Sequence, residues 1–260
     1  MPWFDEERAQ QLLDAAVALG ATMLDTGPTY SDGQAERRLG RALNRLEANV
    51  VISTKVGSHL DARGRIYKDY SQRAIVNSLS SSLKTLGRDS VDIAFVHGPL
   101  DVSDVCSDLY ATLEILKSRG MAEFVGASCD GPVAERIVTD GVLDVLMTTF
   151  NDLNGDPHTV NTAMRSGLHV VAKSPMGSVA VRFPKRPLLR RESAWYNARM
   201  LVRRPNDVAH VLRERLTRTA SGAVGLPFVL AQRAISTAML GTTSIEHLTD
   251  NVHQARLVRS

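Results

Sequence analysis

Four polar residues among the first hundred positions stand at or just after the ends of apolar segments, where a buried strand would meet a loop. Asp25 ends the apolar segment that begins at Ala21, and Tyr30 follows in the next loop. Lys55 and His97 end the next two such segments. Consecutive parallel strands of an α/β barrel end at the same mouth, so we expect these four side chains to meet there.

The four residue types can act as one chemical unit. A phenol has an ordinary pKa of about 10, yet it can donate a proton near neutrality if a cation stabilises its phenolate. Lys55 can supply that cation, Asp25 the counter-charge, and His97 a hydrogen bond to a carbonyl oxygen. The set is suited to the reduction of a carbonyl group. Taken singly, each residue also has a structural interpretation, as a helix cap, a loop contact, a rim charge or a core histidine.

Seven short apolar segments alternate with segments whose apolar residues recur at helical spacing. This alternation predicts a parallel sheet, and the strand number and chain length favour a (β/α)8 barrel over a doubly wound sheet. The barrel is expected to be incomplete at its N-terminal side, because the chain opens with a helix near Asp5. A polar loop is expected between 56 and 70. The predicted strands cover 21–25, 50–55, 91–97, 123–128, 145–151, 168–174 and 237–241.

The chain has 260 residues, of which 43% are hydrophobic and 23% charged, with a net charge of +3. These values are typical of a soluble globular protein, and we expect one domain over residues 1–260. The small net charge does not indicate nucleic-acid binding, and no apolar run approaches the roughly 20 residues of a membrane span. Cys106 and Cys129 lack metal-ligand spacing and indicate a reducing compartment, so a cytoplasmic location is expected.

One long segment, 178–222, departs from the alternation and carries eight Arg and Lys residues between Arg182 and Arg204. Such a segment is most often solvated surface, but it can also fold over the barrel mouth and attract an anionic group. The seven histidines show neither HxH nor HExxH spacing, so no metal site is expected. GxGxxG, Walker and GxSxG motifs are also missing from the sequence, which disfavours Rossmann, P-loop and serine hydrolase sites.

Several motifs resemble those of the aldo-keto reductase superfamily, in the family's order, from about residue 5 to about residue 255. The motifs are LDTGPTYS at 24–31 with ERRLG at 36–40, ISTK at 52–55, and the run from 70 to VHGP at 96–99. The resemblance implies a barrel that transfers a hydride from a nicotinamide cofactor to a small carbonyl substrate. It also implies that Tyr30 is the general acid, that Lys55 and Asp25 tune it, and that His97 orients the substrate carbonyl.

The same resemblance implies a cofactor site at the later strand ends. NADP(H) is expected rather than NAD(H), since the family usually uses NADPH. No Lys or Arg stands at the positions that commonly hold the 2′-phosphate, although His247 occupies an Arg position. The implied cofactor-binding residues are Ser128, Asn151, Ser174, Pro175, Met176, Gly177, Gly241, Thr242, Thr243, His247 and Asn251.

Three positions depart from the family pattern at this site. Cys129 stands where an Asn usually holds the nicotinamide carboxamide, and Met147 replaces the usual Gln. Lys173 stands where an aromatic ring often stacks on the nicotinamide. Two alternatives to a reductase therefore stay open: a non-redox acid/base enzyme such as a dehydratase, isomerase or cyclase, and a catalytically silent binding protein on the same fold.

The family's first barrel strand has no counterpart in this sequence. Either the chain is a shortened version, or the barrel has a gap between strands that begin near Ala21 and Thr237. Unpaired strand edges must be covered, so residues 1–4, a loop or a second subunit are expected to lie there. A monomer or a homodimer is expected.

Overall fold

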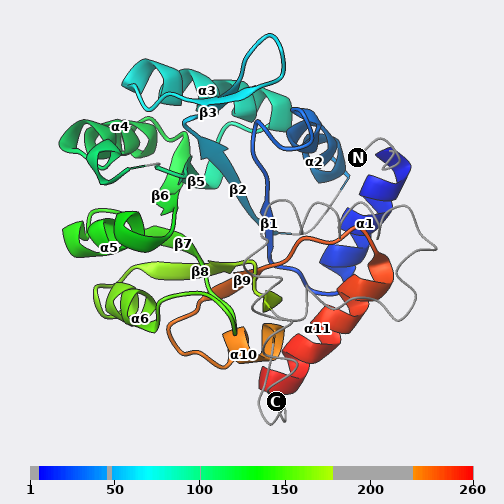
Figure 1. Ribbon diagram of the computed structural model, residues 1–260. Helices are drawn as coiled ribbons and strands as arrows, with labels where there is room; N and C mark the ends of the chain where they lie inside the picture. Colours follow the sequence, from blue (N-terminus) through cyan, green and yellow to red (C-terminus); the bar gives the residue numbers. More distant parts are fainter. Residues whose placement is uncertain (1–5, 46–48, 100, 178–224, 260) are drawn as a thin grey trace.

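The computed structural model describes residues 6–45, 49–99, 101–177 and 225–259 (Figure 1). Within these residues the main feature is a parallel sheet whose strands alternate with helices along the chain. The predicted N-cap Asp5, residues 1–4 and the basic segment 178–222 all lie outside the described residues.

The sheet has seven strands in the order β1-β2-β5-β6-β7-β8-β9, and each neighbouring pair is parallel. It curves into a nearly closed barrel, so the predicted fold class is confirmed (Figure 1). Each strand of this sheet overlaps one of the predicted ones. The strands are β1 (Met23–Asp25), β2 (Val51–Val56), β5 (Val91–His97), β6 (Ala122–Ser128), β7 (Val145–Thr149), β8 (His169–Lys173) and β9 (Thr237–Met239).

Helices follow the strands and cover the outside of the sheet. Ser71 begins the helix α3 by accepting a hydrogen bond from the Ala74 amide at 3.3 Å, and Gly87 ends it in the left-handed conformation at φ 66°. The helices are α1 (Glu6–Ala18), α2 (Gln34–Leu43), α3 (Gln72–Leu86), the 3₁₀ turn η1 (Val102–Asp104), α4 (Ser107–Ser118), α5 (Gly131–Asp140), α6 (Pro157–Arg165), α10 (Leu226–Leu230) and α11 (Ile245–Arg259).

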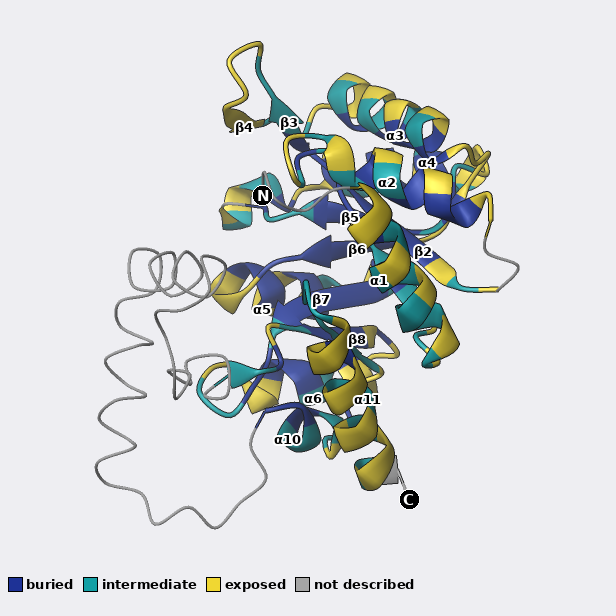
Figure 2. Cartoon of the chain, turned by 90° about the vertical axis from the view of Figure 1, so that its right-hand side faces the viewer, coloured by how far each residue is buried: buried dark blue, intermediate teal, exposed yellow. Residues whose placement is uncertain are grey.

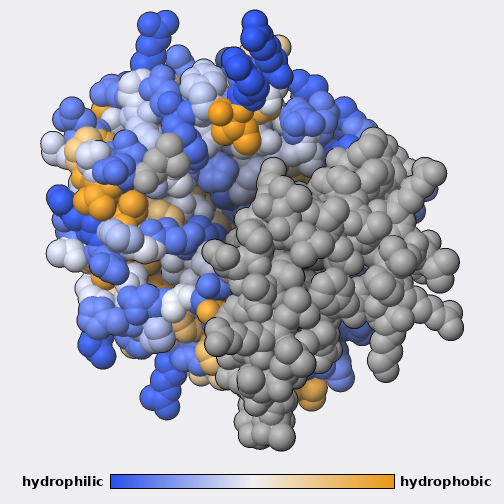
Figure 3. All heavy atoms as spheres, viewed as in Figure 1, coloured by the Kyte–Doolittle hydropathy of each residue, from blue (hydrophilic) through white to orange (hydrophobic). Residues whose placement is uncertain are grey.

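Two apolar clusters hold these layers together. The larger one lies between the sheet and the helices, and a smaller one joins Ile93, Phe95 and Met147 with their neighbours inside the barrel. Figure 2 shows the strands as the buried interior and the helices with exposed outer faces. The surface visible in Figure 3 is mostly hydrophilic with small hydrophobic patches. No helix in the described ranges is long and apolar enough to cross a membrane.

The segment after β2 corrects one prediction. Instead of a polar loop, it forms a two-stranded antiparallel hairpin of β3 (Ser58–Leu60) and β4 (Ile66–Lys68). Asp61 accepts hydrogen bonds from the amides of Arg63 and Arg65 at 2.8 Å, which closes the turn locally. A three-residue strand gives too short an alternation to be recognised in the sequence, so the sequence pattern predicts a loop where the structure has a hairpin.

Strands β1 and β9 are the two edges of the sheet among the described residues. Beside them the first and last helices, α1 and α11, contact each other. Arg256 donates a hydrogen bond to the Leu19 carbonyl at 3.1 Å, and Arg8 donates one to the Thr243 carbonyl at 3.4 Å. These contacts connect the two sides of the barrel next to its sheet edges.

Candidate functional site

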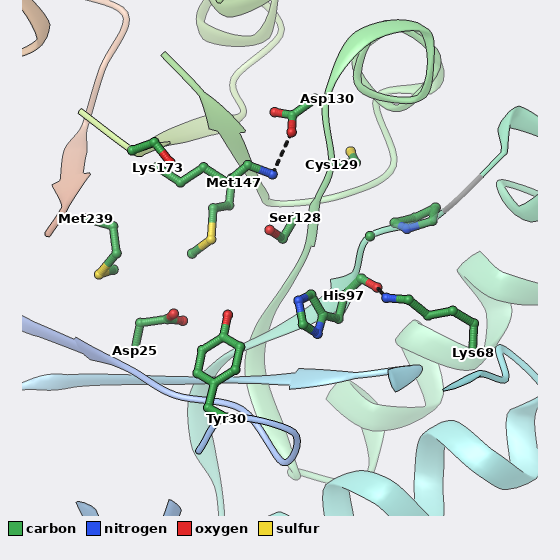
Figure 4. A pocket seen from close by; sticks show the side chains of 13 residues that line it. Asp25, Tyr30, Lys68, His97, Ser128, Cys129, Asp130, Met147, Lys173 and Met239 are labelled. Atoms are coloured by element: carbon green, nitrogen blue, oxygen red, sulfur yellow. Dashed lines mark hydrogen bonds and ion pairs between the residues drawn. The ribbon is translucent and has the colours of Figure 1, made fainter. Parts of the chain in front are cut away.

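A cavity of about 480 Å³ lies at the carboxyl ends of the parallel strands. This volume is within the usual range for small-molecule sites, roughly 300–1,000 Å³. Strands β1, β5, β6, β8 and β9 each contribute their last residue to its wall (Figure 4). The lining residues are Asp25, Tyr30, Lys68, His97, Gly98, Pro99, Ser128, Cys129, Asp130, Met147, Lys173, Ser174 and Met239.

Lys55 forms a buried ion pair with Asp25, which lines this cavity. Lys55 Nζ lies 2.5 Å from Asp25 Oδ2 and 3.0 Å from the Thr26 carbonyl, and the Lys55 side chain is 1% exposed. Ser53 Oγ donates to the other Asp25 oxygen at 2.6 Å. Burial lowers the pKa of the Lys55 ammonium, and the charge and hydrogen bond of Asp25 offset part of that lowering. Each of the two buried charges is thus stabilised by the opposite charge of its partner.

Tyr30 comes from the loop between β1 and α2 and points into the cavity (Figure 4). Lys55 Nζ lies 4.8 Å from the centre of its ring, over the ring face. Burial and then the charge of Asp25 raise the pKa of the Tyr30 phenol. This is the opposite of the expected lowering by Lys55, because burial and the Asp25 charge both favour the neutral phenol.

The His97 ring meets the Tyr30 ring edge-on, with the ring centres 5.8 Å apart. Burial, followed by the positive charges of Lys68, Lys55 and Lys173, lowers the pKa of His97 to about 3. The imidazole is therefore neutral near pH 7. Its Nδ1 is buried and has no hydrogen-bond partner among the described residues.

A second ion pair occupies the opposite wall. Lys173 Nζ lies 3.0 Å from Asp130 Oδ2 (Figure 4). Asp130 also accepts hydrogen bonds from Thr148 Oγ1 at 3.0 Å and from the Thr149 amide at 2.6 Å. Burial acts to raise the Asp130 pKa, but Lys173 and these hydrogen bonds hold it below its usual value. At the position where the family often has an aromatic ring, this chain therefore has a charged residue fixed by its own counter-ion.

Cys129 and Met147 are both buried in the cavity wall, 4% and 2% exposed. Burial is the main cause that raises the pKa of the Cys129 thiol, to about 12. The thiol stays protonated at neutral pH and is a weak hydrogen-bond donor. This position therefore lacks the strong side-chain amide that the family pattern has.

Of the predicted cofactor residues, Ser128 and Ser174 line the cavity. Asn151 Nδ2 donates to the Ser174 carbonyl at 2.9 Å, and its Oδ1 accepts from the amides of Leu153 and Asn154. The Asn151 amide thus ties the 174 turn to the preceding loop. Ser174 has a positive φ of 55°, and Pro175, Met176 and Gly177 continue this turn.

The remaining predicted cofactor residues lie on the loop after β9 and on α11: Gly241, Thr242, Thr243, His247 and Asn251. Thr243 borders a second cavity of about 470 Å³ together with Ser244, Ile245 and the α1 residues Glu7, Arg8, Gln11 and Leu12. Of the predicted cofactor residues, the structure thus places Ser128 and Ser174 in the wall of the main cavity and Thr243 in the wall of the second. It brings none of the others, His247 and Asn251 included, into the wall of either cavity.

Three polar residues near the site escaped prediction as site residues. Asp130 follows a predicted strand and was detectable by the same rule that selected Asp25 and His97. Lys68 gave no such signal, because its hairpin was interpreted as a loop. Glu36 is buried, accepts a hydrogen bond from Thr54 Oγ1 at 2.6 Å and acts electrostatically on Lys55, an environment that its helical position alone does not reveal.

The model of the aldo/keto reductase family matches residues 3–259. The chain is 23% identical to the uncharacterised oxidoreductase YqkF of Bacillus subtilis, over 98% of this chain and 84% of that protein. It is 29% identical to the NADH-specific methylglyoxal reductase of Escherichia coli, over 52% of this chain and 45% of that protein. The holo structure of aldo-keto reductase AKR11C1 from Bacillus halodurans has the same fold, with a TM-score of 0.78 and 22% identity over 96% of this chain and 82% of that one.

Proposed function

This chain belongs to the aldo/keto reductase family, and from that premise we propose that Tyr30 is the proton donor of its reaction. The chain is an NAD(P)H-dependent oxidoreductase that interconverts a small aldehyde or ketone and the corresponding alcohol. The observation that carries the assignment of Tyr30 is its position in the cavity, with the Lys55–Asp25 pair against its ring and the neutral His97 beside it.

The residues of the main cavity fit the nicotinamide end of the cofactor. The cavity is large enough for a small-molecule ligand, and it presents the hydroxyl-bearing residues Ser128 and Ser174 beside the unpartnered His97 Nδ1. When bound, the reduced nicotinamide supplies a hydride to the substrate carbon. Ser128 and Ser174 would hold this end of the cofactor, while Asn151 positions the 174 turn through its hydrogen bond to the Ser174 carbonyl.

The chain's own residues then handle the carbonyl oxygen. The neutral His97 imidazole donates a hydrogen bond to that oxygen and orients it. As the carbon gains the hydride, the oxygen gains negative charge and takes the proton from Tyr30 Oη, leaving a phenolate. The raised pKa keeps Tyr30 protonated before this step, and Lys55 stabilises the phenolate that follows it. Solvent returns the proton to Tyr30.

We place the adenosine and phosphate half of the cofactor at the loop after β9, with NADPH preferred over NADH. Thr243 and Ser244 offer hydroxyl groups there, and Arg8 of α1 borders the same cavity and donates to the Thr243 carbonyl. A guanidinium is suited to a 2′-phosphate, whereas Glu7 in the same cavity opposes one. One relative is named as NADH-specific, so family membership alone does not set the preference. A comparison of kcat/KM with NADPH and with NADH tests this preference.

The remaining properties are proposals of the same kind. We place residues 1–260 in one domain, in agreement with the family match over 3–259. Cys106 and Cys129 are both free thiols, which supports a reducing, cytoplasmic location. A monomer or homodimer with no nucleic-acid partner is consistent with the small net charge.

Replacement of Tyr30 by Phe tests the central assignment. The Tyr30→Phe variant should lose carbonyl reduction by at least roughly 10²-fold in kcat, because general acid catalysis contributes about 10²- to 10⁴-fold. Its affinity for the nicotinamide cofactor should be nearly unchanged, since only a hydroxyl is lost. Steady-state rates and fluorescence titration measure the two quantities. A variant that keeps most of its kcat would remove Tyr30 from this role.

A further inference from the structure

The charges in the wall and floor of the main cavity cancel in pairs, except at one residue. Asp25 is paired with Lys55, and Asp130 is paired with Lys173. His97 is neutral near pH 7. The ammonium of Lys68 also belongs to the wall, and the atoms that it contacts are neutral oxygens. The cavity therefore carries a positive charge at its Lys68 side.

Lys68 is fixed in place by the hairpin and by the end of β5. Its Nζ donates a hydrogen bond to Ser58 Oγ at 2.6 Å and another to the His97 carbonyl oxygen. Figure 4 shows Lys68 beyond His97 as seen from Asp25, so it lies on the other side of the imidazole from the first ion pair. Its side chain is partly exposed, and Asp104 is the carboxylate that acts on it electrostatically.

Gly98 leaves open the space next to this ammonium. Its backbone has a positive φ of 56°, and a Cβ built on it would lie 3.6 Å from Lys68 Nζ and 3.7 Å from the Ser128 carbonyl oxygen. Both distances are ordinary contact distances, so an atom can occupy this position beside the ammonium without a clash. Gly98, Lys68 and Ser128 all line the cavity that holds Tyr30 and His97.

We propose that Lys68 is a specificity-determining residue that makes this enzyme prefer aldehydes or ketones carrying a carboxylate. The carboxylate would lie beside Gly98 and accept a charge-assisted hydrogen bond from Lys68 Nζ, while the carbonyl group lies between Tyr30 and His97. The proposal rests on the proposed function, because it assumes that the carbonyl binds at those two residues. It adds the chemical class of the substrate.

The surroundings of Lys68 favour an anionic ligand. An ammonium that is partly removed from water and hydrogen-bonded to neutral oxygens has lost part of its hydration, and the charge of Asp104 offsets only part of that loss. An anion beside Lys68 offsets the remaining loss, whereas a neutral substrate does not. Lys173 cannot serve a ligand in the same way, because Asp130 already occupies it at 3.0 Å.

The test compares succinic semialdehyde with its methyl ester, which differ by one negative charge. In the wild-type enzyme, kcat/KM for the acid should exceed that for the ester by roughly 10-fold or more, as expected for one charge-assisted hydrogen bond. Lys68→Met should abolish this preference through a higher KM for the acid, so that kcat/KM for the acid falls to that for the ester. Lys68→Arg should keep most of the preference. Lys84→Met, the same change at an exposed position of α3, should have no effect.

Two results would overturn the proposal. One is a wild-type enzyme that reduces the acid and the ester equally well. The other is a Lys68→Met variant that loses both activities in parallel, with a lower kcat, because Lys68 would then only hold the His97 carbonyl in place. If the wild-type enzyme reduces neither compound nor any other carbonyl, the proposed function fails instead. Calorimetric binding of succinate without cofactor still tests Lys68 in that case. Roughly 10-fold weaker binding by Lys68→Met supports the proposal, and equal binding by the two proteins contradicts it.

Discussion

Lys55 Nζ lies 2.5 Å from Asp25 Oδ2 and 4.8 Å from the centre of the Tyr30 ring, so one ammonium contacts both a carboxylate and an aromatic face. The carboxylate contact is the stronger of the two, because an ion pair at this separation and burial outweighs a cation–π contact of about 0.5–2 kcal/mol. Lys55 therefore contributes to stability as well as to the proposed chemistry, and the two contributions can be separated by mutation.

The first prediction separates them. Lys55→Met leaves the Asp25 carboxylate, 9% exposed, without its buried partner. The free energy of unfolding should fall by about 3–5 kcal/mol, as measured by urea denaturation. The double variant Asp25→Asn/Lys55→Met should recover most of this loss, because neither charge is left in the interior. It should still lack carbonyl reduction. A double variant as unstable as the single one would show that the ion pair is not the cause.

The second prediction concerns His97 and pH. Its pKa falls from 6.5 to about 3 in the folded protein, mainly because burial disfavours the imidazolium. Between these two pH values the imidazole is protonated in the unfolded chain but not in the folded one. The contribution of His97 to the free energy of unfolding is therefore complete above pH 6.5 and decreases as the pH falls. The contribution lost by pH 5 is about 2 kcal/mol.

Urea denaturation at several pH values measures this loss. A His97→Gln variant should show a shallower decrease in stability between pH 6.5 and pH 5 than the wild type. His169→Gln, a change at an exposed histidine, should leave the slope as it is in the wild type. Identical slopes for the wild type and His97→Gln would mean that His97 is protonated in the folded protein.

The third prediction concerns Cys129, whose neutral thiol stands where the family usually has an Asn. Cys129→Asn should tighten binding of the nicotinamide cofactor by roughly 5-fold, because one good hydrogen bond is worth about 1 kcal/mol. Fluorescence titration measures the affinity. Cys106→Asn, at the exposed N-cap cysteine of α4, should leave the affinity unchanged. Weaker binding by Cys129→Asn would show that this wall accommodates the thiol and not the amide.

Much of the fold could be predicted because strand ends are marked in this sequence. Asp25, Lys55 and His97 each follow an apolar run, and parallel topology then places those ends at one mouth. The family motifs at 24–31, 52–55 and 96–99 include the same three strand ends. What could not be predicted was the hairpin of β3 and β4, since strands of three residues leave too little alternation to detect.

The details of the site were less predictable, because they depend on burial and on partners distant in sequence. The ordinary pKa of a phenol says nothing about the desolvation that raises the pKa of Tyr30. The position of Lys173 was known, but its partner Asp130 lies 43 positions earlier in the chain, as the numbering shows. Such pairs form only when neighbouring strands are brought together, so the sequence identifies the polar residues without identifying which of them neutralise one another.

The contact between α1 and α11 also has a consequence for how the protein opens and closes. Arg256 and Leu19, which are hydrogen-bonded across it, are 237 positions apart, so this contact closes a very long loop. The entropy cost of such closure grows with the logarithm of loop length. The two exposed hydrogen bonds here offset only a small part of that cost. In native-state hydrogen exchange, the amides of these two terminal helices should therefore exchange through opening events of lower free energy than those of the central strands β5 and β6. We therefore expect fluctuations that separate α1 from α11 to leave the central strands of the sheet folded.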